Sequence, residues 1–304
     1  ESLENFAGQF PLALADYKTA PEDPVLYKLE QSSKNPKVVY RQAGDRYILV
    51  EYGNDNMDLN LSYRVNRLIT MVENHKTVGI VEMSQGVRSV LIEYDGSKIH
   101  QKKLLEILLA YEKEILFVNK WSVKSKVVKL PMAFEDKQTL AAVKRYQETI
   151  RASAPWLPNN VDFVAKINGM TKQDVRDLMY AARFLVLGLG DVFLGAPCAI
   201  PLQGELTARR YPLPLLGSKY NPSRTFTPNG TVGLGGMYMC IYTMESPGGY
   251  QLIGRTIPIW DKLSLGSHST GADGKEQPWL LTPFDQIEFY PVSEEELEVL
   301  TEQT

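Results

Sequence analysis

The chain has 304 residues, of which 44% are hydrophobic and 23% charged, which is typical of a globular protein and allows two domains. The formal net charge of −3 and the lack of an apolar run near 18 residues argue against partners such as nucleic acid or a membrane. Two cysteines and three scattered histidines form neither a disulfide framework nor a metal-ligand pattern, so we expect a cytoplasmic protein without a bound metal.

The N-terminal segment, residues 1–36, is rich in proline, serine and charged residues and follows no regular period. We expect it to be a linker or an extension that lies over the surface. Glu1 and Glu4 stand where a secretory signal would carry positive charge, so no signal peptide is predicted.

A small two-layer α+β domain is predicted over residues 37–118. Alternating apolar residues favour strands, and apolar residues spaced by three and four favour amphipathic helices. In chain order the pattern predicts strands at 38–40 and 47–52, a helix at 59–74, strands at 77–83 and 88–94, and a helix at 101–114.

A second domain, residues 119–304, is predicted to be a β-barrel with a helical insert. Short strands, glycines and prolines dominate from Phe184 onward, a pattern that is typical of a barrel. The first strand of this domain, at 123–132, should pair with late barrel strands near 252–258 and 287–291.

The helical insert covers residues 137–182. Thr171 and Asn159 are predicted N-caps, because their side chains can accept hydrogen bonds from the free amides of a first helical turn. The helices of the insert, and a last helix after the barrel, are predicted at 137–151, 161–167, 172–182 and 293–302.

Four segments follow the insert, and three of them are rich in glycine. They read Gly-Leu-Gly-Asp-Val-Phe-Leu-Gly at 188–195, Lys-Tyr-Asn-Pro-Ser-Arg-Thr-Phe at 219–226, Gly-Leu-Gly-Gly-Met-Tyr-Met-Cys-Ile-Tyr at 233–242 and Ser-Pro-Gly-Gly-Tyr-Gln-Leu-Ile-Gly-Arg-Thr at 246–256. Glycine lets another group approach the backbone closely, so these segments favour a wall of N–H groups around a small polar ligand. The alternative is a barrel whose tight corners require glycine.

The order of these segments resembles the allophanate hydrolase subunit 1 family, also called KipI-like, over roughly residues 38–292. The segment at 246–256 is specific to the broad family. Residues 190–197 and 220–228 are similar to the version of this module inside the biotin-dependent urea carboxylases and urea amidolyases. Simpler members carry a Pro-Gly-Phe type segment where Gly190-Asp191-Val192 stands, so Asp191 is an acidic residue that those members lack. The resemblance also implies a cyclophilin-like barrel in the second domain.

The resemblance implies one subdomain of a carboxyltransferase that moves a carboxyl group from carboxybiotin to urea and gives allophanate. It implies partners in the same enzyme: a subunit-2-like module that shares the active site, a biotin carrier domain, and a biotin carboxylase domain that uses ATP and Mg. The chain has no biotin-accepting Met-Lys-Met segment and no ATP-binding module. The cofactor biotin would therefore act from a separate domain, and the fragment alone should be inactive.

Asp191 is the candidate catalytic residue. Urea offers four N–H donors and one carbonyl acceptor, so its pocket requires carboxylate or carbonyl acceptors. A base within hydrogen-bond reach must also take a proton from the reacting nitrogen. Asp191, next to Gly190, fits both needs, and the alternative is a turn aspartate that caps local amides.

Further residues are assigned to the same site. Backbone donors would stabilise negative charge on the departing ureido oxygen of biotin, and the candidate donors are Gly233, Gly235 and Gly236, with a barrel corner as the alternative. Arg255 is expected to pair with a buried acid such as Asp261 or Asp285. For Asn221 the alternative to substrate binding is a structural turn, because the residue before a proline is held in extended geometry. The candidate substrate-binding residues are Gly190, Tyr220, Asn221 and Arg224.

Two other classes of function fit the resemblance. One is a sister enzyme acting on another small amide, either a guanidine carboxylase or a 5-oxoprolinase-type subunit. The other is a KipI-like regulator that binds a kinase and has no catalytic activity. The acid at Asp191 and the segment at 219–226 argue against the regulator, because both point to the carboxylase branch.

Overall fold

The structure is a computed structural model in which the chain forms two compact units, residues 1–84 with 88–119, and residues 85–87 with 120–304. The residues that it describes are 23–33, 35–115, 122–190, 195–202, 215–260, 269–270 and 276–303. Each unit has a hydrophobic core of its own.

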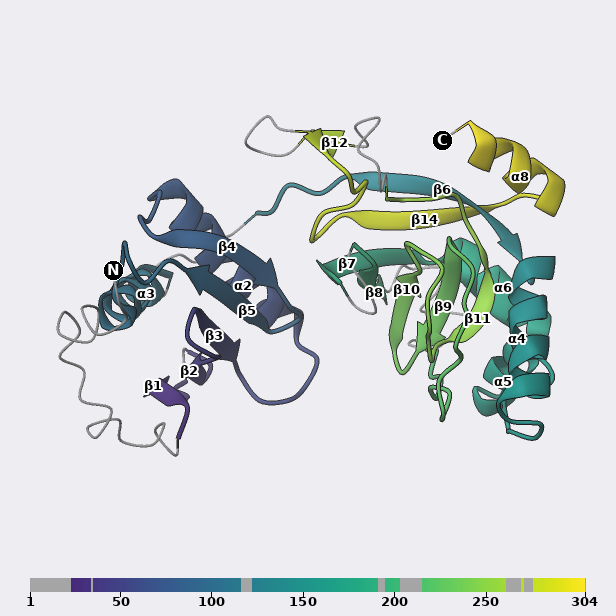
Figure 1. Cartoon of the computed structure of the whole chain (residues 1–304), viewed down its shortest axis with the longest axis horizontal. Coiled ribbons are helices and arrows are strands. Elements are labelled where there is room, and N and C mark those ends of the chain that lie inside the picture. The colour runs from purple at the N-terminus through teal and green to yellow at the C-terminus, as the bar shows by residue number, and fades with distance from the viewer. Residues whose placement is uncertain are drawn as a thin grey trace, which may run out of the picture. The chain divides into compact units, whose positions relative to one another are not determined.

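In the described part of the first unit, a five-stranded sheet lies with two helices (Figure 1). The order across the sheet is β1-β2-β3-β5-β4, and β1, β2, β3 and β5 pair antiparallel in that order. The elements are β1 (Val25–Leu29), β2 (Val38–Gln42), β3 (Tyr47–Tyr52), α2 (Leu59–Asn74), β4 (Ile80–Gln85), β5 (Ser89–Tyr94) and α3 (Gln101–Ile115). The strands and helices predicted between residues 38 and 114 are confirmed, with small differences at their ends.

Strand β1 lies inside the segment that the sequence predicts to be a linker. It pairs with β2 from Leu29 opposite Val38 to Val25 opposite Arg41, with a register shift next to Val25. Its side chains are half-buried or exposed, so it shows no clear apolar alternation. Hydrogen bonding to the edge of β2 forms this strand, and a search for apolar periods misses it for that reason.

A buried acid joins the helices of the first unit to its sheet. Glu112 on α3 is 1% exposed, accepts a hydrogen bond from the Tyr52 hydroxyl at 2.7 Å, and pairs with the Arg64 guanidinium of α2 at 2.6 Å. Burial raises the pKa of Tyr52 well above its ordinary value, so the hydroxyl stays protonated and remains a donor. Since a buried charge persists only when it is paired, these side chains hold α2, α3 and β3 together.

The second unit is built around a closed seven-stranded barrel in the order β10-β8-β7-β14-β6-β11-β9 (Figure 1). A separate two-stranded ribbon pairs β12 (Ser269–Thr270) with β13 (Glu276–Gln277). The predicted α+β class and the predicted β-barrel are confirmed. The barrel strands are β6 (Val127–Phe134), β7 (Arg183–Leu189), β8 (Pro197–Leu202), β9 (Thr231–Gly235), β10 (Tyr238–Ile241), β11 (Gln251–Arg255) and β14 (Gln286–Pro291).

Strand β6 lies between two strands that come much later in the chain. It pairs antiparallel with β11 and parallel with β14, where Val127 lies opposite Gln286 and Met132 opposite Pro291. The pairing that the sequence predicts for this strand is therefore confirmed. The remaining neighbours in the barrel pair antiparallel.

The helices of the second unit are α4 (Lys137–Thr149), α5 (Asn160–Ile167), α6 (Lys172–Ala181) and α8 (Glu294–Glu302). Buried apolar side chains of α5, α6 and the barrel strands form one continuous core. The predicted caps are confirmed, because Asn159 accepts from the Asp162 amide and Thr171 accepts from the Asp174 amide. Within the described ranges, no helix has both the length and the apolar character needed to cross a membrane.

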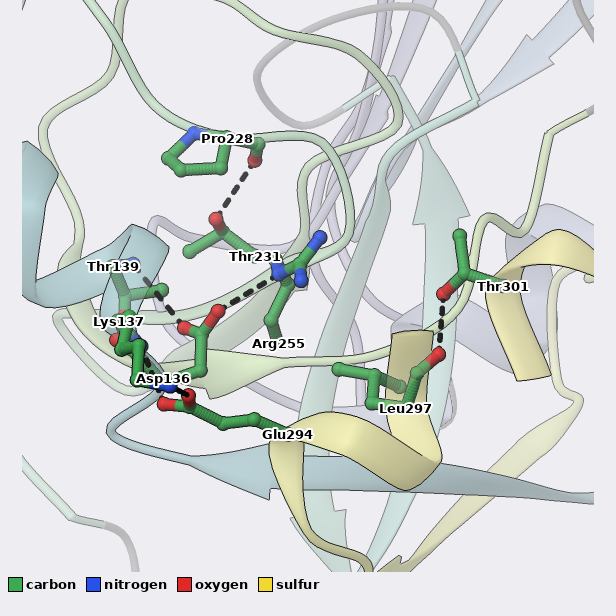
Figure 2. A network of polar contacts seen from close by, with 9 residues as sticks. All are labelled: Asp136, Lys137, Thr139, Pro228, Thr231, Arg255, Glu294, Leu297 and Thr301. Carbon is green, nitrogen blue, oxygen red and sulfur yellow. Dashed lines mark hydrogen bonds and ion pairs between the residues drawn. The ribbon is translucent and has the colours of Figure 1, made fainter. Parts of the chain in front are cut away.

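An ion pair fixes the start of α4 to β11 (Figure 2). Arg255 donates from Nε to Asp136 at 2.8 Å, and the other oxygen of Asp136 accepts from the Thr139 amide at 3.2 Å. The sequence predicts Asp261 or Asp285 as the partner of Arg255. That prediction is wrong for Asp285, whose carboxylate bonds to its own turn and to the start of β6, and Asp261 lies outside the described residues.

Replacing Glu112 by alanine should lower the free energy of unfolding by about 3 kcal/mol, because Arg64 and the Tyr52 hydroxyl lose their buried partner. Thermal or chemical unfolding followed by circular dichroism measures this change. Glu114→Ala, on the exposed side of the same helix, is the matched control and should change the free energy by less than about 0.5 kcal/mol. Equal stability of the two variants would contradict this role for Glu112.

Candidate functional site

The segment at 219–226 pairs with the glycine-rich segment at 246–256 in the second unit. The amide of Tyr220 donates to the carbonyl of Gly249 at 2.7 Å, and Arg224 and Gly248 exchange both backbone hydrogen bonds, at 2.9 and 3.1 Å. Because Gly248 and Gly249 lead directly into β11, these bonds fix the loop at 220–224 to the wall of the barrel.

Tyr220 joins this loop to the helical insert. It is 4% exposed, and its hydroxyl donates to Oδ1 of Asn160 at 2.8 Å. Burial raises the pKa of Tyr220, so the hydroxyl stays protonated. The ring packs edge-on against Tyr146, with 4.7 Å between ring centroids, and against Trp156 at 5.0 Å. The side chain is thus packed inside the unit.

Asn160 is a residue that the sequence analysis missed. Its Oδ1 accepts from both the Tyr220 hydroxyl and the Leu252 amide at 2.8 Å, and its Nδ2 donates to the Trp156 carbonyl at 3.0 Å. One buried amide side chain therefore connects α5, the loop and β11. The sequence did carry a signal for it: Asn160 directly follows Asn159, and because Asn159 already caps the helix, a second asparagine there indicates a different role.

Arg224 is a buried cation, 1% exposed. Its guanidinium lies over the Tyr220 ring, 4.3 Å from the centroid, and Nη1 donates to the Tyr250 carbonyl at 2.7 Å. Nη2 reaches the hydroxyls of Thr227 at 3.3 Å and Tyr242 at 3.4 Å. Its Nε–H makes no hydrogen bond, and no ion pair links it to a carboxylate among the described residues. A π face, a carbonyl and hydroxyls thus compensate this charge.

Asn221 is exposed, as are Pro222 and Ser223, whereas Tyr220 and Arg224 on either side of this turn are buried. The Asn221–Pro222 bond is cis, and both carbonyls of this turn are bound, Asn221 by Arg151 at 2.7 Å and Pro222 by Tyr146 at 2.9 Å. The backbone of the turn is therefore held in place while the amide group of Asn221 faces outward. That arrangement suits a residue that contacts a ligand or another protein module.

The glycines of the predicted donor wall lie in and after β9. Gly233 is the central residue of β9 and pairs on both sides, with β10 and β11, whereas Gly235 ends the strand and pairs with Tyr238 of β10. A Cβ added at Gly235 would overlap the ring of Tyr250, so glycine is needed there for packing. The amide of Gly236 donates to the Gly217 carbonyl at 2.7 Å. A role of these amides in charge stabilisation stays a prediction.

Asp191 lies outside the described residues, whereas Gly190 follows β7 and its amide donates to the Ala196 carbonyl at 2.7 Å. The β7–β8 turn leads into β8, and the β9–β10 hairpin leads into β10. Strands β8 and β10 are neighbours and run antiparallel, so they begin at opposite ends of the barrel. The two turns therefore lie at opposite ends of the barrel. The structure brings Tyr220 and Arg224 together and separates Gly190 from Gly236.

Two depressions lie on the second unit, an apolar one beside Phe184 and Met239 and a polar one beside Glu135 and Asn160. Neither has room for more than about one water molecule. In the part of the chain that is described, no three His, Cys, Asp or Glu side chains are grouped so that they could hold a metal ion. A ligand larger than water would need walls beyond these two depressions.

The sequence and the fold are similar to those of known proteins. Residues 38–267 match the family described as carboxyltransferase domain, subdomain C and D. The urea amidolyase of Lachancea kluyveri is 70% identical over 282 residues, which are 92% of this chain and 15% of that protein. The crystal structure of K. lactis urea amidolyase has 61% identity and a TM-score of 0.81, over 97% of this chain and 17% of that one. A 5-oxoprolinase subunit of Bacillus subtilis is 22% identical, over 86% of this chain and 96% of that protein.

Replacing Arg224 by lysine should lower the free energy of unfolding by about 2 kcal/mol, because an ammonium cannot bind the Tyr250 carbonyl and stack on Tyr220 at once. Replacing Asn221 by alanine should change it by less than about 0.5 kcal/mol, because that side chain is exposed. Thermal unfolding of both variants measures the difference. An Arg224→Lys protein as stable as Asn221→Ala would show that the guanidinium does not hold the loop.

Proposed function

The chain belongs to the carboxyltransferase domain family, subdomain C and D, and from this membership we propose that it forms part of the carboxyltransferase of a urea carboxylase. In the whole enzyme a carboxyl group would pass from biotin to a nitrogen of urea, which loses a proton and becomes allophanate. The observation that carries the proposal is the 70% identity to a urea amidolyase over 92% of this chain.

We propose that the active site is shared with a second module of the same enzyme. This chain spans 15% of the length of that amidolyase, so most of the enzyme lies outside it. Neither of the two depressions on the second unit has room for the biotin ring or for urea, which supports a site that residues beyond this chain complete. A subunit-2-like module would supply the missing walls, while biotin carrier and ATP-using biotin carboxylase domains would supply the carboxyl group.

Within such a shared site, the residues of this chain would act on urea. Asp191 would accept a hydrogen bond from an N–H group of urea and then take the proton from the reacting nitrogen, because a carboxylate both binds amide donors and serves as a base. Asn221 lies on the loop beside the β9–β10 hairpin, at the end of the barrel away from the turn of Asp191, so we propose it as a contact for the second module and not for urea. Tyr220 and Arg224 would support it from below, because both are buried.

A 5-oxoprolinase-type subunit is the second candidate function. The observation that favours it is the similarity to the 5-oxoprolinase subunit of Bacillus subtilis, which this chain matches along 96% of its length. The identity is only 22%, compared with 70% for the urea amidolyase, so the urea carboxylase is preferred. Guanidine remains the alternative substrate of a carboxylase, because it is also planar and has N–H donors, with a further N–H group where urea has its carbonyl oxygen.

Steady-state assays of the full-length enzyme test the substrate. With ATP, bicarbonate and biotinylated enzyme, urea should support ADP release at a kcat/KM at least about tenfold above that of guanidine or 5-oxoproline, as expected when a pocket is built for one hydrogen-bonding pattern. Guanidine turned over better than urea would make this a guanidine carboxylase. Turnover of 5-oxoproline alone would support the second candidate.

Replacing Asp191 by asparagine in the full-length enzyme should lower urea-dependent turnover by on the order of 10², the scale expected for a positioned base. The melting temperature should stay nearly unchanged, because the variant keeps the shape of the side chain. Asp177→Asn, on the exposed face of α6, is the matched control and should keep full turnover. Near-normal turnover of Asp191→Asn would remove this acid from the mechanism.

A further inference from the structure

The two cysteines of the chain lie on neighbouring strands of the barrel, although they are far apart in the sequence. Strand β10 pairs antiparallel with β8, and Met239 lies opposite Ala199. Because the two strands run in opposite directions, the residue after Met239 faces the residue before Ala199. These residues are Cys240 and Cys198. The register of the pair therefore places the two cysteines opposite each other.

Both cysteine side chains point away from the interior of the barrel. Met239 and Ala199 belong to the continuous core of the second unit, and successive side chains of a strand point to opposite faces. Cys240 and Cys198 are the next residues along their strands, so both side chains lie on the outer face. In agreement with this, Cys240 packs with Tyr242 in a separate small cluster.

Glycine occupies the position beside each cysteine on its other neighbouring strand. Cys198 lies opposite Gly188 of β7, and Cys240 lies opposite Gly233 of β9. The four residues form one row across the neighbouring strands β7, β8, β10 and β9 (Figure 1). Since glycine has no side chain, the side chain that each cysteine meets along this row is that of the other cysteine.

The spacing of opposite residues in an antiparallel pair suits a disulfide. Their Cα atoms are roughly 4.5 or 5.5 Å apart, according to whether the two residues exchange hydrogen bonds. Disulfides join residues whose Cα atoms are roughly 4.4 to 6.8 Å apart, so both arrangements fall within the range. Both cysteines are thiols in the structure, with Cys198 half-buried and Cys240 buried. An oxidant from the solvent therefore reaches Cys198 more readily than Cys240.

We propose that Cys198 and Cys240 are an oxidative modification site, which a peroxide converts into a disulfide. Hydrogen peroxide oxidises the Cys198 thiol to a sulfenic acid and releases one water. The Cys240 sulfur then attacks the Cys198 sulfur, the S–S bond forms, and the hydroxyl group leaves with the Cys240 proton as a second water. The two thiols lose two electrons, and the peroxide gains them. A thiol such as glutathione reverses the reaction by exchange and is itself oxidised. This chemistry does not depend on the proposed function.

Peptide mapping of the full-length enzyme by mass spectrometry tests the pair. Trypsin places Cys198 in peptide 184–209 and Cys240 in peptide 225–255, each with a single cysteine. After treatment with hydrogen peroxide and alkylation of the remaining thiols, the two peptides should appear as one linked species that a reductant separates. Cys240→Ala should lose this species completely. In that variant Cys198 should instead be labelled by dimedone, a reagent for sulfenic acids, because the thiol that consumes the sulfenic acid is gone.

Several results would overturn the proposed pair. One is oxidation of Cys198 to the sulfinic or sulfonic acid without linkage in the wild-type enzyme, and another is no oxidation of Cys198 at all. Equal dimedone labelling of Cys198 in the wild type and in Cys240→Ala would also contradict it, as would a link found only between two copies of the chain on a non-reducing gel. If Cys240→Ala does not fold, Cys240→Ser gives the same comparison with a side chain of similar size. None of these measurements uses urea turnover, so they are read separately from the test of the proposed function.

Discussion

The amide side chain of Asn160 is the contact on which the candidate loop depends. It is buried, so each of its polar atoms must find a partner, and it binds the Tyr220 hydroxyl, the Leu252 amide and the Trp156 carbonyl. These partners come from the loop, from β11 and from the approach to α5. Moving any one of the three would leave a buried polar group unpaired, which costs about 1–3 kcal/mol. The helical insert and the barrel therefore hold the loop as one body.

The buried charge of Arg224 gives the same loop its chemical character. Cation–π contact with Tyr220 and the carbonyl of Tyr250 replace the carboxylate that usually accompanies a buried guanidinium. The segment at 219–226 contains no acidic residue, so the Arg224 charge adds positive potential beneath the exposed Asn221.

Much of the fold follows from local signals in the sequence. The helices around Asn159 and Thr171 were predictable because a cap and an apolar period lie within a few residues of each other. Features that depend on distant partners were not: β1 forms only because β2 has a free edge, and Arg255 pairs with Asp136 across 119 residues. The glycine-rich segments look like one wall in the sequence, yet strand direction places Gly190 and the β9–β10 hairpin at opposite ends of the barrel. No local pattern carries that information.

The parallel pairing of β6 with β14 has a consequence for how the protein is made. Ser125 and Phe284, which bond to each other next to this pair, are 159 residues apart. At a ribosomal rate of about 5–20 residues per second, roughly 8 to 30 s pass between the appearance of the two strands. During that interval the apolar faces of β6, α5 and α6 have no partner on that side. The barrel therefore cannot close until β14 has been synthesised, which makes the C-terminal strand the last step in folding the second unit.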